Sequence, residues 1–495
     1  MTAYEGTCCV VLHTHLPWLA HAGTWPVGEE WLYQAFTGSY RRVVRVLEEL
    51  AAEGRTGQLT LGVTPVVAAM LDDPYCLREL HTWAGDWRLR AEYAAGRPEL
   101  RDLATREYRA ATACLADLEA RWLTGGLSSV LRPLRDAGVV EVLGGPATHP
   151  FQPLLDPRLR AFALRLGLDD ARLRLGGPAP DGIWAPECGY APGMEDGYAA
   201  AGVWRFLVDG PTLRGDTGAA RPVRDSGVVA FGRDLEVTYR VWSPRSGYPG
   251  DPRYRDFHTF DHPTGFRPAR VTSKRLPPEA KRPYDPDLAG AAVAEHVDDF
   301  VRTVRDRLAA LRARHGRPGL VVVAYDTELF GHWWYEGPEW LAGVLRALPA
   351  AGVRVATLAG ALEAGHLGPP VELPAGSWGS GKDWRVWDGE QVADLVAESA
   401  RVGRRLLELV DAHRTRQRSP ALDQLVREAL LALSSDWAFM VTKDSAAGYA
   451  RGRFAEHVSR FEKLAALLGT GDEGTYAAEL ARLDGPFGHL DARLL

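Results

Sequence analysis

Two short apolar runs in this sequence each lead to a carboxylate. Residues 182–185 run into Glu187, and residues 320–324 run into Asp326. A short apolar run bounded by turn residues predicts a buried β-strand. In a parallel β/α barrel the carboxyl ends of all strands open on one face, where such enzymes build their active sites. Because one acid to attack and one to donate a proton suffice to cleave a glycosidic bond, the pair indicates that chemistry.

Similar apolar runs recur through the first 360 residues, with helical patterns such as residues 40–52 and 291–314 between them. The predicted strands are residues 8–12, 59–63, 139–143, 182–185, 205–208, 228–231, 320–324 and 353–357. Alternating strands and helices indicate an α/β fold with a parallel sheet. Seven or eight strands favour a barrel over an open sheet.

The pattern changes in three parts of the chain. Residues from about 72 to 136 show helical periodicity and predict a helical insertion, and from residue 391 onward the pattern is wholly helical. We therefore expect a catalytic barrel over 1–390 and a helical domain over 391–495, which is an ordinary domain size. Residues 243–286 are rich in Pro, Gly, Asp and aromatics. A loop this long in a compact enzyme is usually functional or disordered.

Composition excludes several classes of function. The net charge of −6 offers no basic surface for nucleic acid or anionic lipid. The five scattered cysteines suit neither a disulfide framework nor a zinc cluster, so we expect a cytoplasmic protein. No basic leader precedes a long apolar stretch, and no apolar run reaches the roughly 18 residues of a membrane span.

Polar residues follow four of the predicted strands. His13 and His15 follow the first strand, His149 the third, Glu187 the fourth and Asp326 a later one. A single buried histidine is more often a satisfied core residue, but four strands that deliver such side chains to one face are hard to explain by packing. These residues are therefore our candidates for the site.

A metal site is the alternative explanation of the histidines. His13 and His15 with an acid could hold zinc, although both rings reach one ion only if the local backbone aims them together. We favour hydrogen bonding to sugar hydroxyls and tuning of the carboxylates, and we expect neither a metal nor a cofactor.

Tryptophan is abundant, at 16 residues. Trp378 and Trp387 lie in a polar, glycine-rich stretch, where flat rings could stack on the apolar faces of sugars or pack into the core. The sequence leaves both open.

Five ordered segments resemble the signatures of glycoside hydrolase family 57. They are residues 13–17 (HTHLP), 145–149 (GPATH), 184–190 (WAPECGY), 325–334 (YDTELFGHWW) and 434–440 (SSDWAFM). The resemblance implies that Glu187 is the nucleophile and Asp326 the acid/base of a retaining mechanism.

Within the family the sequence is most similar to the 1,4-α-glucan branching enzymes, through residues 26–31, the 377–387 stretch and the helical C-terminal region. This resemblance implies an incomplete, seven-stranded barrel and a covering loop that carries Tyr248. The segment after His258 is shorter than the resemblance leads us to expect. The substrate-binding residues that we expect are His13, His15, Trp25, His149, Trp184, Tyr248, Phe330, His332, Trp378, Trp387, Asp436 and Trp437.

The expected function is therefore cleavage of α-1,4 and formation of α-1,6 linkages in an α-glucan such as amylose or glycogen, by a monomer or small homo-oligomer. A family 57 α-amylase or 4-α-glucanotransferase uses the same two acids. A metal-dependent deacetylase or mannosidase, and a glucan-binding protein without activity, are further alternatives.

Overall fold

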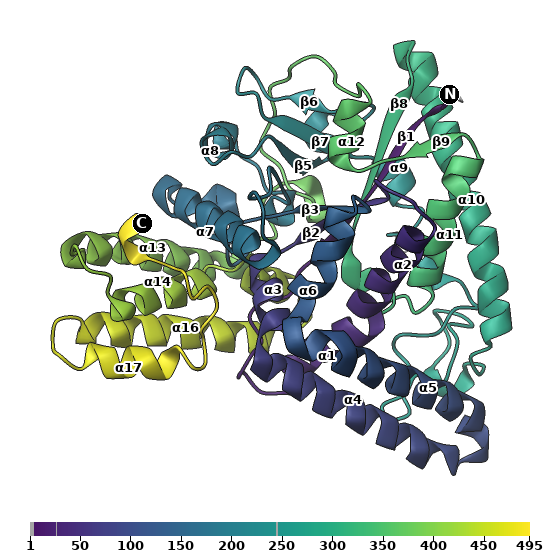
Figure 1. Ribbon diagram of the computed structural model, residues 1–495, viewed down its shortest axis with the longest axis horizontal. Coiled ribbons are helices and arrows are strands. Elements are labelled where there is room, and N and C mark those ends of the chain that lie inside the picture. Colours follow the sequence, from purple (N-terminus) through teal and green to yellow (C-terminus); the bar gives the residue numbers. More distant parts are fainter. Residues whose placement is uncertain (1–3, 26, 244–245) are drawn as a thin grey trace.

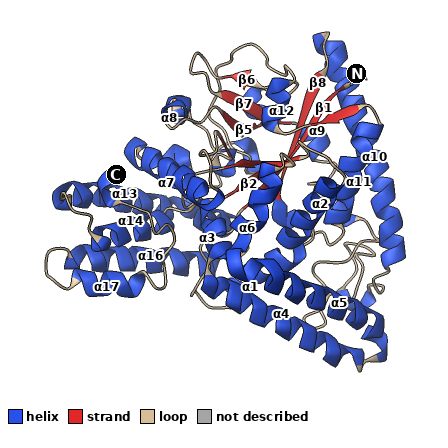
Figure 2. Ribbon diagram, in the orientation of Figure 1, coloured by secondary structure: helices blue, strands red, loops and turns tan. Residues whose placement is uncertain are grey.

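The computed structural model describes residues 4–25, 27–243 and 246–495. Strands and helices alternate through the first 363 residues, and only helices follow from residue 393 (Figures 1 and 2). None of the helices within the described ranges combines the length and apolar character that crossing a membrane requires. The α/β class predicted from the sequence is confirmed.

The first sheet is entirely parallel and has β1 near its centre. Its order is β3-β2-β1-β8, and β9 pairs with the beginning of β1. The bounds are β1 Gly6–Thr14, β2 Leu59–Val63, β3 Val140–Leu143, β8 Gly319–Asp326 and β9 Val353–Val355. His13 of β1 lies opposite Asp326 of β8 in the register. The two side chains therefore start from neighbouring strand ends.

The second sheet has the order β4-β5-β7-β6, and only the pair β6–β7 is antiparallel. The bounds are β4 Gly182–Ile183, β5 Arg205–Asp209, β6 Arg221–Pro222 and β7 Val229–Arg233. A parallel bridge between Gly144 and Ile183 connects the first sheet to the second. At the other edge, Asp234 N–H donates to Val322 O (2.8 Å), which links β7 to β8.

The strands are apolar because both of their faces are buried. All nine residues of β1 are buried. Alternate residues point to opposite faces of a strand: Cys8, Val10 and Leu12 join the large core that the helices form, whereas Cys9 and Val11 join an inner core. Leu143, Leu207, Phe231 and Val322 from four other strands contribute to this inner core. Strands of both sheets thus share one inner core.

The helices before residue 364 cover the outer face of the strands. Two of them, α4 and α5, pack together and project from the rest of the fold (Figure 1). The bounds are α1 Glu29–Ala35, α2 Arg41–Ala52, α3 Pro65–Asp72, α4 Pro74–Ala95, α5 Arg101–Asp117, α6 Leu123–Asp136, α7 Pro157–Leu175, α8 Met194–Ala200, α9 Leu235–Thr238, α10 Pro286–His315, α11 Gly337–Ala350 and α12 Leu358–Glu363. The longest, α10, starts where the Asp285 side chain caps the backbone N–H of Asp287 and Leu288 and ends at Gly316 with φ +68°.

Five helices form the C-terminal region (yellow-green in Figure 1). They are α13 Ala393–His413, α14 Pro420–Ala432, α15 Ser435–Lys443, α16 Ala447–Leu467 and α17 Glu473–Leu480. Every residue from Ala421 to Ala432 of α14 is buried, because α13, α16 and α17 pack around it. The predicted boundaries at 390 and around 72–136 stay predictions, since a contact between helices does not define a domain.

The long loop predicted over 243–286 contains only short turns and isolated bridges in its described part, 243 and 246–285, and Pro286 already begins α10. It lies against the projecting pair: Arg97 of the α4–α5 connection forms an ion pair with Asp261 (2.7 Å), and Arg90 of α4 donates to Thr264 O (3.2 Å). The loop is therefore fixed to α4 and its neighbourhood by polar contacts.

Candidate active site

A cavity of about 1700 Å³ opens at the carboxyl ends of the parallel strands. The polar residues that line it near the strand ends are His13, His15, His149, Glu187, Arg233, Asp326, Glu328 and Asp436. All except Asp436, which lies on α15, come from strand ends or from the turns that directly follow a strand. One cavity is therefore lined by side chains from the ends of several strands.

Glu187 sits in a tight turn, Pro186–Cys188, directly after β4. Its φ is +60° and that of Cys188 is +50°, a left-handed conformation that non-glycine residues rarely adopt. Such strain persists where the surrounding structure enforces it, often at functional sites. The backbone N–H of Trp378 donates to Glu187 O (2.9 Å) and helps to hold the turn.

Both carboxylate oxygens of Glu187 accept hydrogen bonds. Ser435 Oγ donates to Oε1 (2.8 Å), and Trp378 Nε1 donates to Oε2 (2.8 Å). Burial raises the pKa of Glu187 to about 7, because it outweighs these two donors, which favour the ionised form. A carboxylate held in this way can act as a nucleophile once it is ionised.

Asp326 ends β8 and faces the same cavity. Burial raises its pKa to about 6, against the opposing charges of Arg233 and His15. Two residues on, burial and the charge of Asp326 raise the pKa of Glu328 to about 8, and Tyr40 OH donates to Glu328 Oε1. A carboxyl group whose pKa is raised toward neutrality can serve as general acid and, later, as general base.

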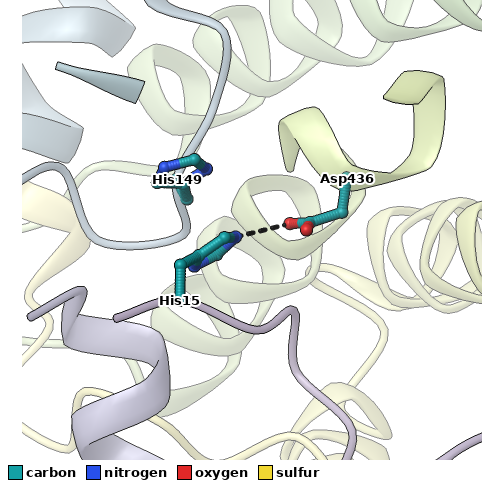
Figure 3. A group of neighbouring side chains, drawn as sticks. All are labelled: His15, His149 and Asp436. Carbon is teal, nitrogen blue, oxygen red and sulfur yellow. Dashed lines mark hydrogen bonds and ion pairs between the residues drawn. The ribbon is translucent and has the colours of Figure 1, made fainter. Parts of the chain in front are cut away.

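His13, His15 and His149 lie together beside Asp436, and Figure 3 shows His15, His149 and Asp436. His15 Nε2 lies 2.9 Å from Asp436 Oδ2, and its ring stacks on that of His149 at 3.7 Å. His149 Nε2 lies 3.0 Å from His13 Nε2. Burial lowers the pKa of His13 and of His149 well below the usual value. Burial opposes protonation of His15 too, but Asp436 raises its pKa overall.

The ligand atoms of His15, His149 and Asp436 all lie within 4.8 Å of one another, a spacing that a metal ion could use. Every ring nitrogen of the two histidines already has a polar partner. His15 contacts Thr64 Oγ1 and Asp436, and His149 contacts Ser435 Oγ and the ring of His13. Asp436 is itself one of the three candidate ligands, but His149 uses both ring nitrogens on partners outside the trio, so the geometry favours hydrogen bonding over a metal centre there.

Comparison with known proteins gives the family. The sequence model described as "Glycosyl hydrolase family 57" matches residues 9–363, and one described as "1,4-alpha-glucan branching enzyme, C-terminal" matches residues 398–495. The chain belongs to glycoside hydrolase family 57.

Relatives in this family align over the whole chain. A probable 1,4-α-glucan branching enzyme of Mycobacterium tuberculosis is 56% identical, over 99% of this chain and 98% of that protein. The structure of a family 57 branching enzyme from the archaeon Pyrococcus horikoshii matches with a TM-score of 0.93 at 30% identity and covers 99% of this chain and 96% of that one. An α-amylase from Thermotoga maritima matches with a TM-score of 0.88 at 26% identity, with coverage of 99% and 98%. The fold alone therefore does not separate the two activities.

The cavity of this family 57 chain contains most of the predicted site residues. The predicted residues that line it are His13, His15, Trp25, His149, Glu187, Asp326, His332, Trp378, Trp387 and Asp436. Trp25 is 77% exposed, whereas Trp387 is buried and stacks on Phe151 at 4.8 Å. Trp25 can therefore offer a whole ring face to a sugar, and Trp387 only an edge.

Four predicted substrate-binding residues do not line the cavity. Trp184 stacks beneath His13 at 4.3 Å, and Trp437 donates through Nε1 to Leu431 O. Phe330 is fully buried. Tyr248 OH donates to Asp299 Oδ2 (2.7 Å). In this conformation these rings pack the interior, and their contact with substrate stays a prediction.

Arg233 and Ser435 were not among the predicted residues. Arg233 ends β7 and contacts Asp209 through Nε (2.8 Å), while its guanidinium lies over the Trp378 ring at 5.2 Å. The rule that identified Glu187, a polar residue directly after an apolar run, applies to Arg233 as well. Ser435 lies in the segment 434–440 that resembles the fifth family signature, a signal that could have identified it, and it reaches the site through the docking of α15.

Proposed function

We propose that this chain is a retaining 1,4-α-glucan branching enzyme that cleaves α-1,4 and forms α-1,6 linkages. The observation that carries the proposal is that Glu187 and Asp326, the acids of two segments that resemble family signatures, line one cavity. The relatives named as branching enzymes and the match of the C-terminal region to a branching-enzyme model support transfer rather than hydrolysis.

In the first half of the reaction, Glu187 attacks the anomeric carbon of the donor chain and Asp326 protonates the departing oxygen. The product is a covalent glycosyl-enzyme. In the second half, Asp326 removes the proton from the 6-hydroxyl of an acceptor chain, which attacks the same carbon. Two inversions retain the α configuration, and the retaining mechanism predicts about 5–5.5 Å between the two carboxyl groups.

Exposed aromatic rings around the cavity support a polysaccharide substrate. Trp25, Trp242, Trp333, Phe260 and Phe439 are each at least 37% exposed and line it. Flat apolar faces can bind the apolar faces of sugar rings and hold an acceptor chain in place.

We further propose that the two sheets form one incomplete barrel of seven parallel strands, in the order β8-β1-β2-β3-β4-β5-β7. The Gly144–Ile183 bridge and the hydrogen bond from Asp234 to Val322 support this closure. On this view the barrel with its helical insertion spans 1–390 and the helical domain 391–495. Five buried free cysteines support a reducing cytoplasm. A monomer or small homo-oligomer remains our proposal for the assembly.

Incubation with amylose tests the activity. We expect new α-1,6 anomeric signals in the proton NMR spectrum with little increase in reducing ends, because each cleaved bond is replaced by a new glycosidic bond. Reducing ends that rise in step with cleavage, without α-1,6 signals, would show a family 57 α-amylase instead.

The raised pKa values predict a narrow pH optimum. The reactive form has Glu187 ionised and Asp326 protonated, so activity falls at low pH as Glu187 gains a proton and at high pH as Asp326 loses one. With pKa values of about 7 and about 6, the reactive form is a minority, and the two limbs of kcat/KM lie near pH 6 and pH 7. A profile that stays flat from pH 5 to pH 8 would contradict these environments.

A further inference from the structure

Ser435 of α15 links the C-terminal helices to the nucleophile. Its side chain is buried, and its backbone N–H donates to His149 O (3.0 Å). The adjacent Thr148 Oγ1 donates to Leu430 O (2.6 Å). These contacts fix the Ser435 hydroxyl between Glu187 Oε1 at 2.8 Å and His149 Nδ1 at 2.9 Å.

The hydrogen-bond directions follow from the number of protons. A hydroxyl group has one hydrogen, and Ser435 donates it to ionised Glu187, so His149 Nδ1–H must donate to Ser435 Oγ. Burial keeps His149 and His13 neutral at pH 7. The Nε2 of His149 is therefore an acceptor, and the Nε2–H of His13, 3.0 Å away, donates to it.

The last group in this series of hydrogen bonds, His13, agrees with the assigned direction. His13 Nδ1 is buried and has no hydrogen-bond partner among the described residues. In the direction assigned here it carries only a lone pair. A proton on Glu187 Oε1 would require every hydrogen bond from Glu187 to His13 to reverse. His13 Nδ1 would then carry an N–H group with no acceptor. Buried N–H groups without an acceptor are rarer in proteins than under-satisfied acceptors.

We propose that Ser435 is a positioning residue for the reaction proposed above: its hydroxyl, oriented by His149, keeps Glu187 ionised and aimed into the cavity. Protonation of Glu187 would turn one oxygen into a donor that faces either the Ser435 hydroxyl or the Trp378 N–H. Loss of the Ser435 donor therefore destabilises the ionised nucleophile.

Other charged groups around Glu187 do not replace this donor. His149 Nδ1 lies 3.8 Å from Glu187 Oε1, but the ring is neutral. His15 and Asp436 act on Glu187 in opposite directions and are paired with each other. The loop that contains Trp378 contributes an uncharged donor.

The test uses α-maltosyl fluoride as donor, because fluoride departs without protonation and the first step then depends on Glu187 but not on the acid. The pre-steady-state burst of fluoride is measured from pH 5 to pH 9 for wild type and for Ser435→Ala, Ser435→Thr and Thr442→Val. Thr442 lies on the same helix but bonds Val386 O outside the cavity, so it is the matched control.

We expect a single acidic limb, whose midpoint moves upward by about one pH unit in Ser435→Ala, because a hydrogen bond to a charged group has about this effect. The burst is then about tenfold slower at pH 6 and nearly unchanged at pH 9. Ser435→Thr and Thr442→Val keep the wild-type limb. A Ser435→Ala burst that is slower by one factor at every pH, or unchanged, would overturn the proposal. Since an α-amylase of this family would use the same nucleophile, the test remains decisive even if the amylose experiment shows hydrolysis.

Discussion

Replacing Glu187 with Gln is expected to lower the rate of branching by about 10⁴-fold or more, because loss of a covalent nucleophile removes the whole two-step route. The amide keeps the shape of the side chain and can still accept from Trp378 Nε1, so the cavity should persist. Rates are measured with amylose by the appearance of α-1,6 linkages. Glu236→Gln is the matched control, since Glu236 is an exposed carboxylate that does not line the cavity.

The stability of Glu187→Gln shows whether the loss is chemical. The pKa of Glu187 is raised in the folded protein, so its contribution to stability is present below its ordinary pKa and is lost as the pH rises through about 7. At pH 8 wild type buries an ionised group that the variant lacks, and the variant should have an equal or higher Tm. A variant that branches amylose at a rate close to wild type would show that Glu187 is not the nucleophile.

Replacing Asp326 with Asn is expected to lower kcat on amylose by about 10²–10⁴-fold, the usual contribution of a general acid. The loss should depend on the leaving group. With α-maltosyl fluoride the first step needs no proton, so the glycosyl-enzyme still forms. Its transfer to an acceptor hydroxyl lacks a base, and the intermediate accumulates.

Intact-mass spectrometry of Asp326→Asn after mixing with α-maltosyl fluoride measures this intermediate, and peptide mapping should place the sugar on Glu187. Azide, which attacks without a base, should restore turnover and give the α-azide, because the mechanism retains configuration. Formation of the β-azide would instead indicate a direct displacement. A first fluoride release that is slowed as much as the reaction on amylose would remove Asp326 from the acid role.

The strands were predictable because burial on both faces leaves them apolar. All eight runs named from the sequence coincide with strands, and β6 escaped because it is two residues long and contains Pro222. Residues that directly follow a strand were predictable for the same reason, as Glu187 and Asp326 show. Arg233, which ends β7 two residues after an apolar run, meets the same criterion.

The remaining part of the site depends on packing between distant segments. Ser435 contacts Glu187 across 248 positions of sequence, and although both lie in segments that resemble family signatures, no local pattern indicates that the two side chains meet. Tyr248 shows the opposite case: its loop was recognisable, but the contact of its hydroxyl with Asp299 of α10 determines where the ring lies. Local sequence patterns therefore predict which side chain lies at the end of a strand, but not which distant residues that side chain contacts.

The position of Ser435 after the described strands in the sequence has a consequence for synthesis. Ribosomes release a chain from its N-terminus, and its domains generally fold in that order. All the strands of this protein emerge before α15, so a growing chain can assemble its acids while Glu187 still lacks the hydroxyl donor and His15 lacks Asp436. A nascent chain that has exposed only its strands therefore holds Glu187 without the hydroxyl donor that the proposal assigns to Ser435.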